Sequence, residues 1–281
     1  MFESYFGFSS PPFQLSPDPS FYYESREHGN ALSYLKFGVY QSEGFIVVTG
    51  EIGAGKTTLV RTLLNSLNTD EIVAAQVLNT QLDTLDLLRS ICTAYGIAPE
   101  GSTKAQLIAT LEAFFTAVAA GGRRALLVID EAQNLGLKEI EELRMLSNFQ
   151  LGNRALLQSF LVGQPELRDM LRSSAMEQLR QRVIASCHLG PMSGEETQAY
   201  IEHRLRQVGW SGNPRFGEGA FQQIHQACGG IPRRINLLCT RLLLATFLAG
   251  KTEIDAAQVS LVSQELFAEM GAPAGPLAAA L

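Results

Sequence analysis

Runs of apolar residues alternate with longer segments of helical periodicity along the first two thirds of the chain. Five runs have the length and apolar content of buried strands: residues 45–49, 72–78, 125–130, 156–162 and 183–189. The intervening patterns predict helices at residues 26–41, from the glycine-rich stretch after the first strand to Leu67, and at 83–95, 103–120 and 137–151. Near-continuous apolar strands separated by helices predict a mostly parallel sheet with helices on both faces.

The alternation of apolar runs and helical segments ends after Gly190 and Pro191, and no further strand is predicted. Ser193 and Glu196 have the spacing of a capping box, and a helix is expected to about Val208. Apolar spacing, proline and glycine positions then predict helices at about 217–227, 232–250 and 255–269. An α/β body at residues 26–190 should therefore be followed by an all-helical domain at 191–270 and a linker or tail at 271–281.

The first 25 residues combine many aromatic side chains with several prolines. The prolines exclude a regular helix or a central strand over residues 5–25. Aromatic residues are scarce in disordered tails, so this N-terminal extension is expected to pack on the folded body.

Composition narrows the class of protein. The 281 residues are 46% hydrophobic and 18% charged, which is typical of a soluble globular protein. The net charge of −6 argues against a broadly basic nucleic-acid-binding surface. No apolar run reaches the roughly 20 residues of a membrane span, and the first residues lack the pattern of a signal peptide. The cysteines have no paired spacing, so free thiols in a reducing cytoplasm are expected: Cys92, Cys187, Cys228 and Cys239.

The stretch GEIGAGKT, residues 50–57, fits the phosphate-binding pattern G-x-x-x-x-G-K-[ST] and lies between a predicted strand and a predicted helix. Small residues let backbone N–H groups close around phosphate oxygens, and the helix N-terminus adds partial positive charge. Lys56 would contact the β- and γ-phosphates, Thr57 would ligate Mg²⁺, and Thr58 would reach the α-phosphate. The predicted nucleotide-binding set is Gly50, Glu51, Ile52, Gly53, Ala54, Gly55, Lys56, Thr57 and Thr58. The alternative is a glycine-rich turn without a ligand.

An acidic pair ends the third predicted strand. Asp130 stands where ligands bind in α/β sheets and could hold Mg²⁺ through its water shell. Glu131 is placed to polarise a water molecule for attack on the γ-phosphate. A simple helix N-cap is the alternative. Together with the phosphate loop, the pair favours hydrolysis of ATP.

With these two motifs, the chain resembles the AAA+ ATPases over about residues 1–270. The resemblance implies a three-layer parallel-sheet sandwich with a helical lid, and a polar sensor at Gln164, which could equally be a helix cap or a turn residue. It also implies an arginine finger that acts on a neighbouring subunit. Arg182 matches that position, Arg180 is the fallback, and a solvated basic turn is the alternative. Arg233, in GGIPRRIN, matches the second sensor on the lid, whereas Arg234 could face solvent or a partner.

A narrower resemblance is to secretion ATPases of the general secretion pathway protein A type, in particular those found with exosortase and exopolysaccharide systems. It is carried by long ordered segments: FGFSSPPFQLSPDPSFYY, LLVIDEAQNL, EELRMLSNFQLG, LVGQPELR, LRQRVIASCHLGPMSGEETQAYIEHRL and GGIPRRINLLC. This resemblance implies that Phe13, Leu15 and Pro17 lie near the adenine, with packing on the body as the alternative. It also implies partners in an envelope or inner-membrane export system and a cytoplasmic location at the membrane periphery.

The leading hypothesis is an ATPase that hydrolyses ATP with Mg²⁺, forms homo-oligomers through the Arg182 face, and drives or regulates a bacterial envelope secretion or exopolysaccharide export system. The alternative is a transposition-type AAA+ regulator that forms ATP-dependent filaments on DNA, against which the acidic composition counts. A nucleotide-gated scaffold without turnover is a third reading, and a P-loop kinase is the least compatible. The acidic face of residues 137–151 is expected to be solvated, with a partner surface as the alternative.

Overall fold

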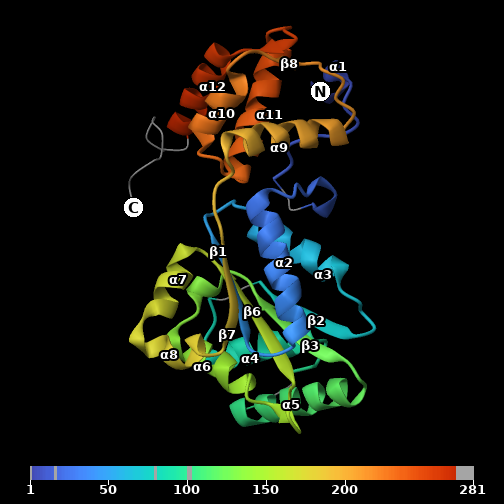
Figure 1. Cartoon of the computed structure of the whole chain (residues 1–281), viewed down its shortest axis with the longest axis vertical. Coiled ribbons are helices and arrows are strands. Elements are labelled where there is room, and N and C mark those ends of the chain that lie inside the picture. Colours follow the sequence, from blue (N-terminus) through green and yellow to red (C-terminus); the bar gives the residue numbers. More distant parts are fainter. Residues whose placement is uncertain (1, 16–17, 79–80, 100–102, 270–281) are drawn as a thin grey trace. The chain divides into compact units, whose positions relative to one another are not determined.

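The computed structural model describes residues 2–15, 18–78, 81–99 and 103–269 (Figure 1). The predicted tail at 271–281 lies outside the described residues. The chain forms two compact units. One, called here the sheet unit, comprises residues 28–51 and 59–189. The other, the helical unit, comprises residues 1–27, 52–58 and 190 onward. Each is described by itself below.

The sheet unit is built on five parallel strands in the order β2-β3-β6-β1-β7. Their bounds are β1 Phe45–Gly50, β2 Ile72–Val77, β3 Arg124–Ile129, β6 Leu157–Gly163 and β7 Val183–Leu189. Each coincides with a predicted strand to within one residue at either end. The predicted parallel α/β sheet is confirmed.

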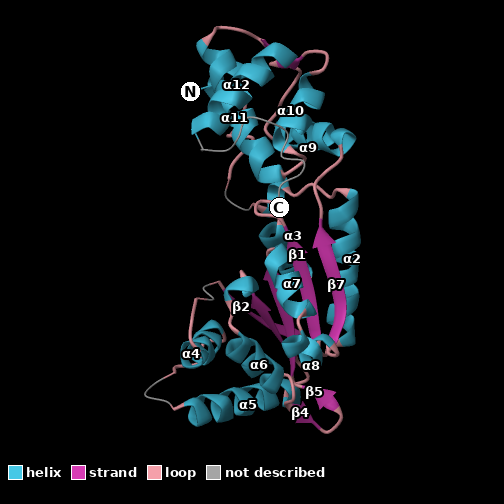
Figure 2. Cartoon of the chain, turned by 90° about the vertical axis from the view of Figure 1, so that its left-hand side faces the viewer, coloured by secondary structure: helices cyan, strands magenta, loops and turns pink. Residues whose placement is uncertain are grey.

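The order of the strands places the helices on two faces. The connection from β1 to β2 runs along the sheet in the opposite direction to the other three connections. Because such crossovers are right-handed, the helix after β1 lies on the opposite face from the helices that follow. The helices are α2 Arg26–Gln41, α3 Lys56–Ser66, α4 Thr84–Ala94, α5 Lys104–Ala120, α6 Leu137–Leu146 and α7 Pro165–Arg172. Figure 2 shows α2 on one side of the sheet and α4, α5 and α6 on the other.

A continuous apolar core fills the space between the sheet and α4 to α7. Phe115 of α5, Leu143 of α6 and Leu161 of β6 are fully buried in it. The strands alternate their side chains, so Ile46 of β1 faces the other layer, where it leaves room only for the glycine at position 38 of α2. The core therefore holds the carboxyl ends of β1, β3 and β6 in fixed register.

The predicted helix at 137–151 ends earlier than expected. Helix α6 stops at Leu146, and residues 150–151 (β4, Gln150–Leu151) pair with β5 (Arg154–Ala155) in a short antiparallel hairpin. The physical reason is the turn at Gly152, which has a positive φ of 65° and lets the chain reverse. The hydrogen bonds that a longer helix would have made are replaced by hairpin pairing.

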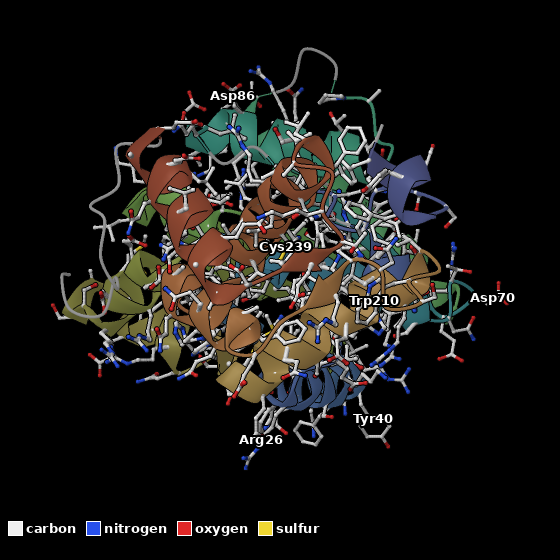
Figure 3. The ribbon with its side chains drawn as sticks, turned by 90° about the horizontal axis from the view of Figure 1, so that it is seen from above. Arg26, Tyr40, Asp70, Asp86, Trp210 and Cys239 are labelled. Carbon is white, nitrogen blue, oxygen red and sulfur yellow. The ribbon has the colours of Figure 1, made fainter. Side chains whose placement is uncertain are left out.

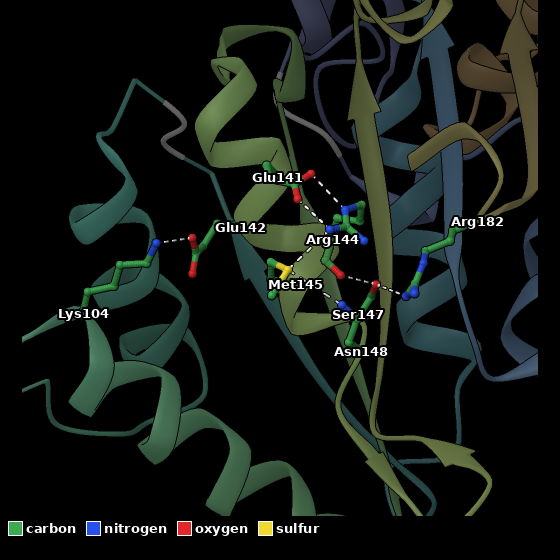
Figure 4. A network of polar contacts seen from close by, with 8 residues as sticks. All are labelled: Lys104, Glu141, Glu142, Arg144, Met145, Ser147, Asn148 and Arg182. Carbon is green, nitrogen blue, oxygen red and sulfur yellow. Dashed lines mark hydrogen bonds and ion pairs between the residues drawn. The ribbon is translucent and has the colours of Figure 1, made fainter. Parts of the chain in front are cut away.

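The acidic face of α6 is less solvated than predicted. Glu142 is only 6% exposed and forms an ion pair with Lys104 at 2.6 Å (Figure 4). Glu139 accepts a hydrogen bond from Thr84, and Glu141 binds Arg144 through both carboxylate oxygens. These carboxylates therefore fasten α6 to its neighbours and to its own last turn.

The helical unit consists mainly of the chain after residue 190. Its elements are α1 Phe2–Phe6, η1 Pro19–Phe21, α9 Gly194–Gln207, α10 Ala220–Cys228, α11 Pro232–Leu248 and α12 Ala256–Glu269. Both sides of the predicted capping box at Ser193 and Glu196 are present, and Asp255 accepts a hydrogen bond from the backbone N–H of Gln258 at the start of α12. The unit also contains a two-residue parallel pair that was not predicted, β8 (Arg215–Phe216) with β9 (Glu253–Ile254).

The N-terminal segment packs on the helical unit. Phe6, Phe8 and Phe13 are buried in its core. Arg204 of α9, itself 6% exposed, donates to the carbonyl oxygen of Pro12 at 2.7 Å and to the hydroxyl of Tyr200 at 2.9 Å. Of the three residues that the resemblance placed near an adenine, Phe13 is thus a core residue, Leu15 is 54% exposed, and Pro17 lies outside the described residues.

We expect Phe13→Ala to lower the free energy of unfolding of the helical unit by about 3–5 kcal/mol, because truncation of a buried phenyl ring leaves a cavity. Trp210 is the only tryptophan and packs on the core of this unit, so its fluorescence in a urea titration reports the change (Figure 3). Leu15→Ala is the matched control, and as an exposed substitution it should change stability by about 0.5 kcal/mol or less. Equal effects of the two substitutions would contradict a core role for the N-terminal segment.

Among the residues that the structure describes, none of the helices has the length and apolar character needed to cross a membrane.

The four cysteines are free thiols, and burial raises the pKa of Cys187 to about 11 and that of Cys228 to about 12. These two thiols are therefore protonated and poorly reactive near neutral pH.

Candidate functional site

The phosphate loop has the local structure that its sequence predicts. Strand β1 ends at Gly50, residues 51–55 turn, and α3 begins at Lys56. Gly53 and Gly55 have φ of 83° and 97°, a conformation that favours glycine. Ala54 is fully buried and Lys56 is 7% exposed, whereas Glu51 and Ile52 are exposed. The loop thus presents the backbone N–H groups of a helix N-terminus, the arrangement that binds phosphate.

Two glycines of the loop are fixed by close neighbours. A Cβ at Gly50 would lie 2.8 Å from the carbonyl oxygen of Leu189 on the paired strand β7. A Cβ at Gly53 would overlap the Cβ of Arg233 in the first turn of α11. The backbone N–H of Arg233 also donates to the Gly53 carbonyl oxygen at 3.2 Å. Within the helical unit, the structure therefore brings the predicted second sensor against the phosphate loop. Arg233 is exposed, and Arg234 is half-buried.

The acidic pair lies at the carboxyl edge of the sheet. Strands β1, β3 and β6 are parallel and end at Gly50, Ile129 and Gly163, so their ends meet at one edge. Asp130 follows β3 directly, is 5% exposed, and donates its backbone N–H to the Val77 carbonyl oxygen at 2.9 Å.

Glu131 adopts a backbone conformation that is unusual for a residue other than glycine. Its φ and ψ are 50° and 40°, in the left-handed region. The Oδ1 atom of Asp130 accepts the Glu131 backbone N–H at 3.0 Å and so supports this turn. Strained positions of this kind cluster at functional sites, because the surrounding structure must stabilise them.

Two amide side chains hold the Glu131 carboxylate. The Nε2 atom of Gln133 donates to Glu131 Oε2 at 2.6 Å, and the Nε2 atom of Gln164 donates to the same oxygen at 3.1 Å. Gln164, predicted to be either a sensor or a helix cap or turn residue, occupies the N-cap position of α7, but its side chain makes no capping bond. Gln133 was not among the predicted site residues. Its position two residues after Glu131, in the short 3-10 helix η2 (Ala132–Asn134), is the signal that could have indicated it.

The two arginines predicted as candidate fingers make their hydrogen bonds away from the acidic pair. Arg182 precedes β7, and its Nη1 donates to the Ser147 hydroxyl at 2.9 Å, where Ser147 caps the end of α6 (Figure 4). Arg180 donates to the carbonyl oxygens of Leu171 and Arg172, each at 3.1 Å. Both guanidinium groups therefore bind within their own chain.

The distance of Arg182 from the acidic pair follows from strand geometry. Arg182 lies at the amino end of β7, where its carbonyl oxygen accepts the backbone N–H of Phe45, the first residue of β1. Strand β7 has seven residues and so spans about 20 Å at about 3.3 Å per residue. Glu131 is at the opposite, carboxyl edge. The structure thus brings Glu131 and Gln164 together and leaves Arg182 at the far edge of the same sheet.

The fold and the site define a class. Residues 39–171 match a family model described as an AAA domain. The Aeropyrum pernix ORC2 protein in its ADPNP-ADP complexes matches with a TM-score of 0.63 at 16% identity, over 89% of this chain and 72% of that one. The Thermotoga maritima RuvB Holliday junction branch migration motor matches with a TM-score of 0.54 at 20% identity, over 87% and 70%. At these low identities, the two matches support the fold only. The family match and the phosphate loop together show an AAA domain of the P-loop NTPase class in this chain.

Sequence similarity gives a narrower placement. The chain is 40% identical over 267 residues to General secretion pathway protein A of Aeromonas hydrophila, covering 95% of this chain and 48% of the relative. It is 25% identical over 190 residues to an uncharacterized HTH-type transcriptional regulator of Methanocaldococcus jannaschii, covering 66% and 46%. The chain therefore spans about half the length of the curated relatives it matches. The predicted resemblance to the general secretion pathway protein A type is confirmed, whereas the placement with exosortase systems stays a prediction.

Proposed function

We propose that this chain binds ATP with Mg²⁺ and hydrolyses it in an assembly of identical subunits that drives or regulates an envelope secretion or exopolysaccharide export system. The observation that carries the proposal is the shared edge of the sheet. Strand β1 leads into the phosphate loop at the same edge where β3 leads into Asp130 and Glu131. Ligands bind at the carboxyl ends of strands in open α/β sheets.

The binding roles follow from the chemistry of the side chains. The backbone N–H groups of residues 51–55 and the Lys56 ammonium would bind the phosphates, and Thr58 would contact the α-phosphate. A hydroxyl and a carboxylate are the oxygen donors that Mg²⁺ prefers, so Thr57 and Asp130 would hold the ion, which would neutralise charge on the phosphates.

The catalytic roles divide between two subunits. Glu131 would act as the base that orients and deprotonates the attacking water, with Gln164 beside it and Arg233 contacting phosphate from the helical unit. Arg182 is about 20 Å from the carboxyl edge of its own sheet, by the length of β7. It would therefore act on the γ-phosphate of a neighbouring subunit. The face of the molecule that carries Arg182 would then form the contact between identical subunits.

The cellular role rests on the similarity to General secretion pathway protein A. By that similarity, the partners would be proteins of an envelope or inner-membrane export system, and the chain would work at the cytoplasmic side of the membrane through them. A net charge of −6 makes a general affinity for DNA unfavourable.

Phosphate release and light scattering, measured together over a protein concentration series, test the proposal. We expect a non-hydrolysable ATP analogue to shift the protein from monomer to oligomer, and the turnover per subunit to rise with concentration. Chelation of Mg²⁺ should abolish turnover. A chain that stays monomeric with the analogue at all concentrations would contradict the shared site, and a nucleotide-dependent affinity for DNA at physiological salt would favour the transposition-type alternative.

A further inference from the structure

The side-chain amide of Gln133 joins the ends of two neighbouring strands. Its Nε2 donates to the Glu131 carboxylate, which follows β3, at 2.6 Å. Its Oε1 accepts the backbone N–H of Gln164, which follows β6, at 3.0 Å. One amide group thus uses its donor on the predicted base and its acceptor on the strand end that carries the second amide.

The neighbouring backbone leaves space for this amide. A Cβ at Gly163, the last residue of β6, would lie 2.7 Å from Gln133 Oε1 and 2.9 Å from a methyl carbon of Leu167. Gly163 does not have a positive φ, so its backbone conformation does not require glycine. Space for the Gln133 amide and for Leu167 is what the missing side chain provides.

The effect on Glu131 follows from the two amide donors. Gln133 and Gln164 both donate to Oε2, so the carboxylate is held in one orientation by bonds from two directions. A general base must be held within reach of the proton that it takes, so a fixed orientation of the carboxylate serves that role. We propose that Gln133 is a positioning residue, which fixes the orientation of the Glu131 carboxylate through the Gln133–Glu131 and Gln133–Gln164 contacts. This inference rests on the proposed role of Glu131 as the base.

A purely structural role for Gln133, as a tie between η2 and β6, makes a different prediction. Gln133→Glu keeps an oxygen that can accept the Gln164 backbone N–H, but it replaces the donor to Glu131 by a second carboxylate. Gln133→Met keeps the unbranched length and removes both hydrogen bonds. The first variant therefore tests the contact with Glu131 while the tie to β6 is kept.

We expect Gln133→Met to lower kcat for ATP about tenfold, less than the loss from removing a general base itself, with little change in KM. Gln133→Glu loses the donor to Glu131 and keeps the tie to β6, so its kcat should fall at least as far, again with little change in KM. The carbon-13 chemical shift of the Glu131 carboxyl in nucleotide-free protein, measured at one pH, should move in both variants, because both lose the hydrogen bond from the Gln133 amide. This second readout does not depend on turnover.

The other charged groups around Glu131 are the same in all variants. Asp130 is its neighbour in the chain, and α7, which packs on η2, carries Glu166, Arg168, Asp169 and Arg172. Glu166, Arg168 and Asp169 are exposed, and Arg172 pairs with Asp169 at 3.6 Å. A difference in kcat between Gln133→Glu and the wild type can therefore be assigned to the exchange at position 133.

Glu131→Gln separates the proposed function from the positioning role of Gln133. The unfolding midpoint of each variant is measured alongside its turnover. If Glu131→Gln is inactive but both Gln133 variants are folded with wild-type kcat, the positioning role is overturned and the proposed function stands. If Gln133→Met loses kcat while Gln133→Glu, which keeps the bond to the Gln164 backbone, has wild-type kcat, Gln133 is only a tie. If Glu131→Gln keeps full turnover, the proposed function fails, and the positioning role fails with it.

Discussion

Replacing Glu131 by Gln is expected to lower the rate of phosphate release from ATP by about 10²–10⁴-fold, the usual contribution of a general base. The reason lies in the contacts of the carboxylate. Gln133 and Gln164 both donate to Glu131 Oε2, and the carbonyl oxygen of a glutamine at position 131 can accept the same two bonds. The substitution therefore keeps the local structure and removes only the ability to take a proton.

Binding and turnover should separate in this variant. We expect a fluorescent ATP analogue to bind Glu131→Gln as tightly as the wild type, and ATP-induced assembly, followed by light scattering, to persist because the nucleotide is not consumed. Glu112→Gln on α5 is the matched control, since it neutralises an exposed carboxylate remote from the carboxyl edge and should keep full turnover. Unchanged phosphate release in Glu131→Gln would show that the acidic pair is a helix cap and not part of a hydrolytic site.

Replacing Arg182 by Ala is expected to lower turnover by about 10³-fold or more, the lower range for loss of an arginine finger. Arg182 lies at the amino edge of the sheet and donates to the Ser147 hydroxyl. It therefore does not contact Asp130 or Glu131 at the carboxyl edge of its own subunit. The loss of turnover should therefore come with unchanged ATP affinity in the monomer. Arg180→Ala is the control and should have a smaller effect, because its guanidinium binds the carbonyl oxygens of Leu171 and Arg172.

Mixing two inactive variants tests the action of Arg182 across subunits. Glu131→Gln keeps the arginine, and Arg182→Ala keeps the base. A mixed assembly therefore contains interfaces where Arg182 of one subunit faces an intact Glu131 of another, and turnover should partly recover. No recovery in mixtures shown by light scattering to co-assemble would contradict a finger in trans. Full activity of Arg182→Ala alone would exclude this residue and leave Arg180 to be tested.

The local elements of the fold were predictable from the pattern of apolar residues. The five strands and the capped helices after residue 190 agree with their predictions, because each depends on periodicity and end signals within about 20 residues. One departure from these predictions has a clear physical reason. Helix α6 ends at Leu146, five residues before its predicted end, since pairing of residues 150–151 with 154–155 competes with the helix. The apolar pattern places Glu142 on a solvated face, but the tertiary structure brings Lys104 of α5 into an ion pair with it.

The strands, the helices and the motifs at residues 50–57 and 130–131 could be recognised in the sequence, because each depends on residues adjacent in the chain, and the chemical roles of these motifs stay predictions. The strand order, the burial of Phe13 among the helices after residue 190, and the place of Arg182 at the sheet edge away from Glu131 depend on the tertiary structure. The tertiary structure also places the Gln133 amide between Glu131 and Gln164, and Gln164 lies 31 residues after Gln133 in the chain. Such contacts join segments distant in sequence, and no periodicity or motif within either segment carries their geometry.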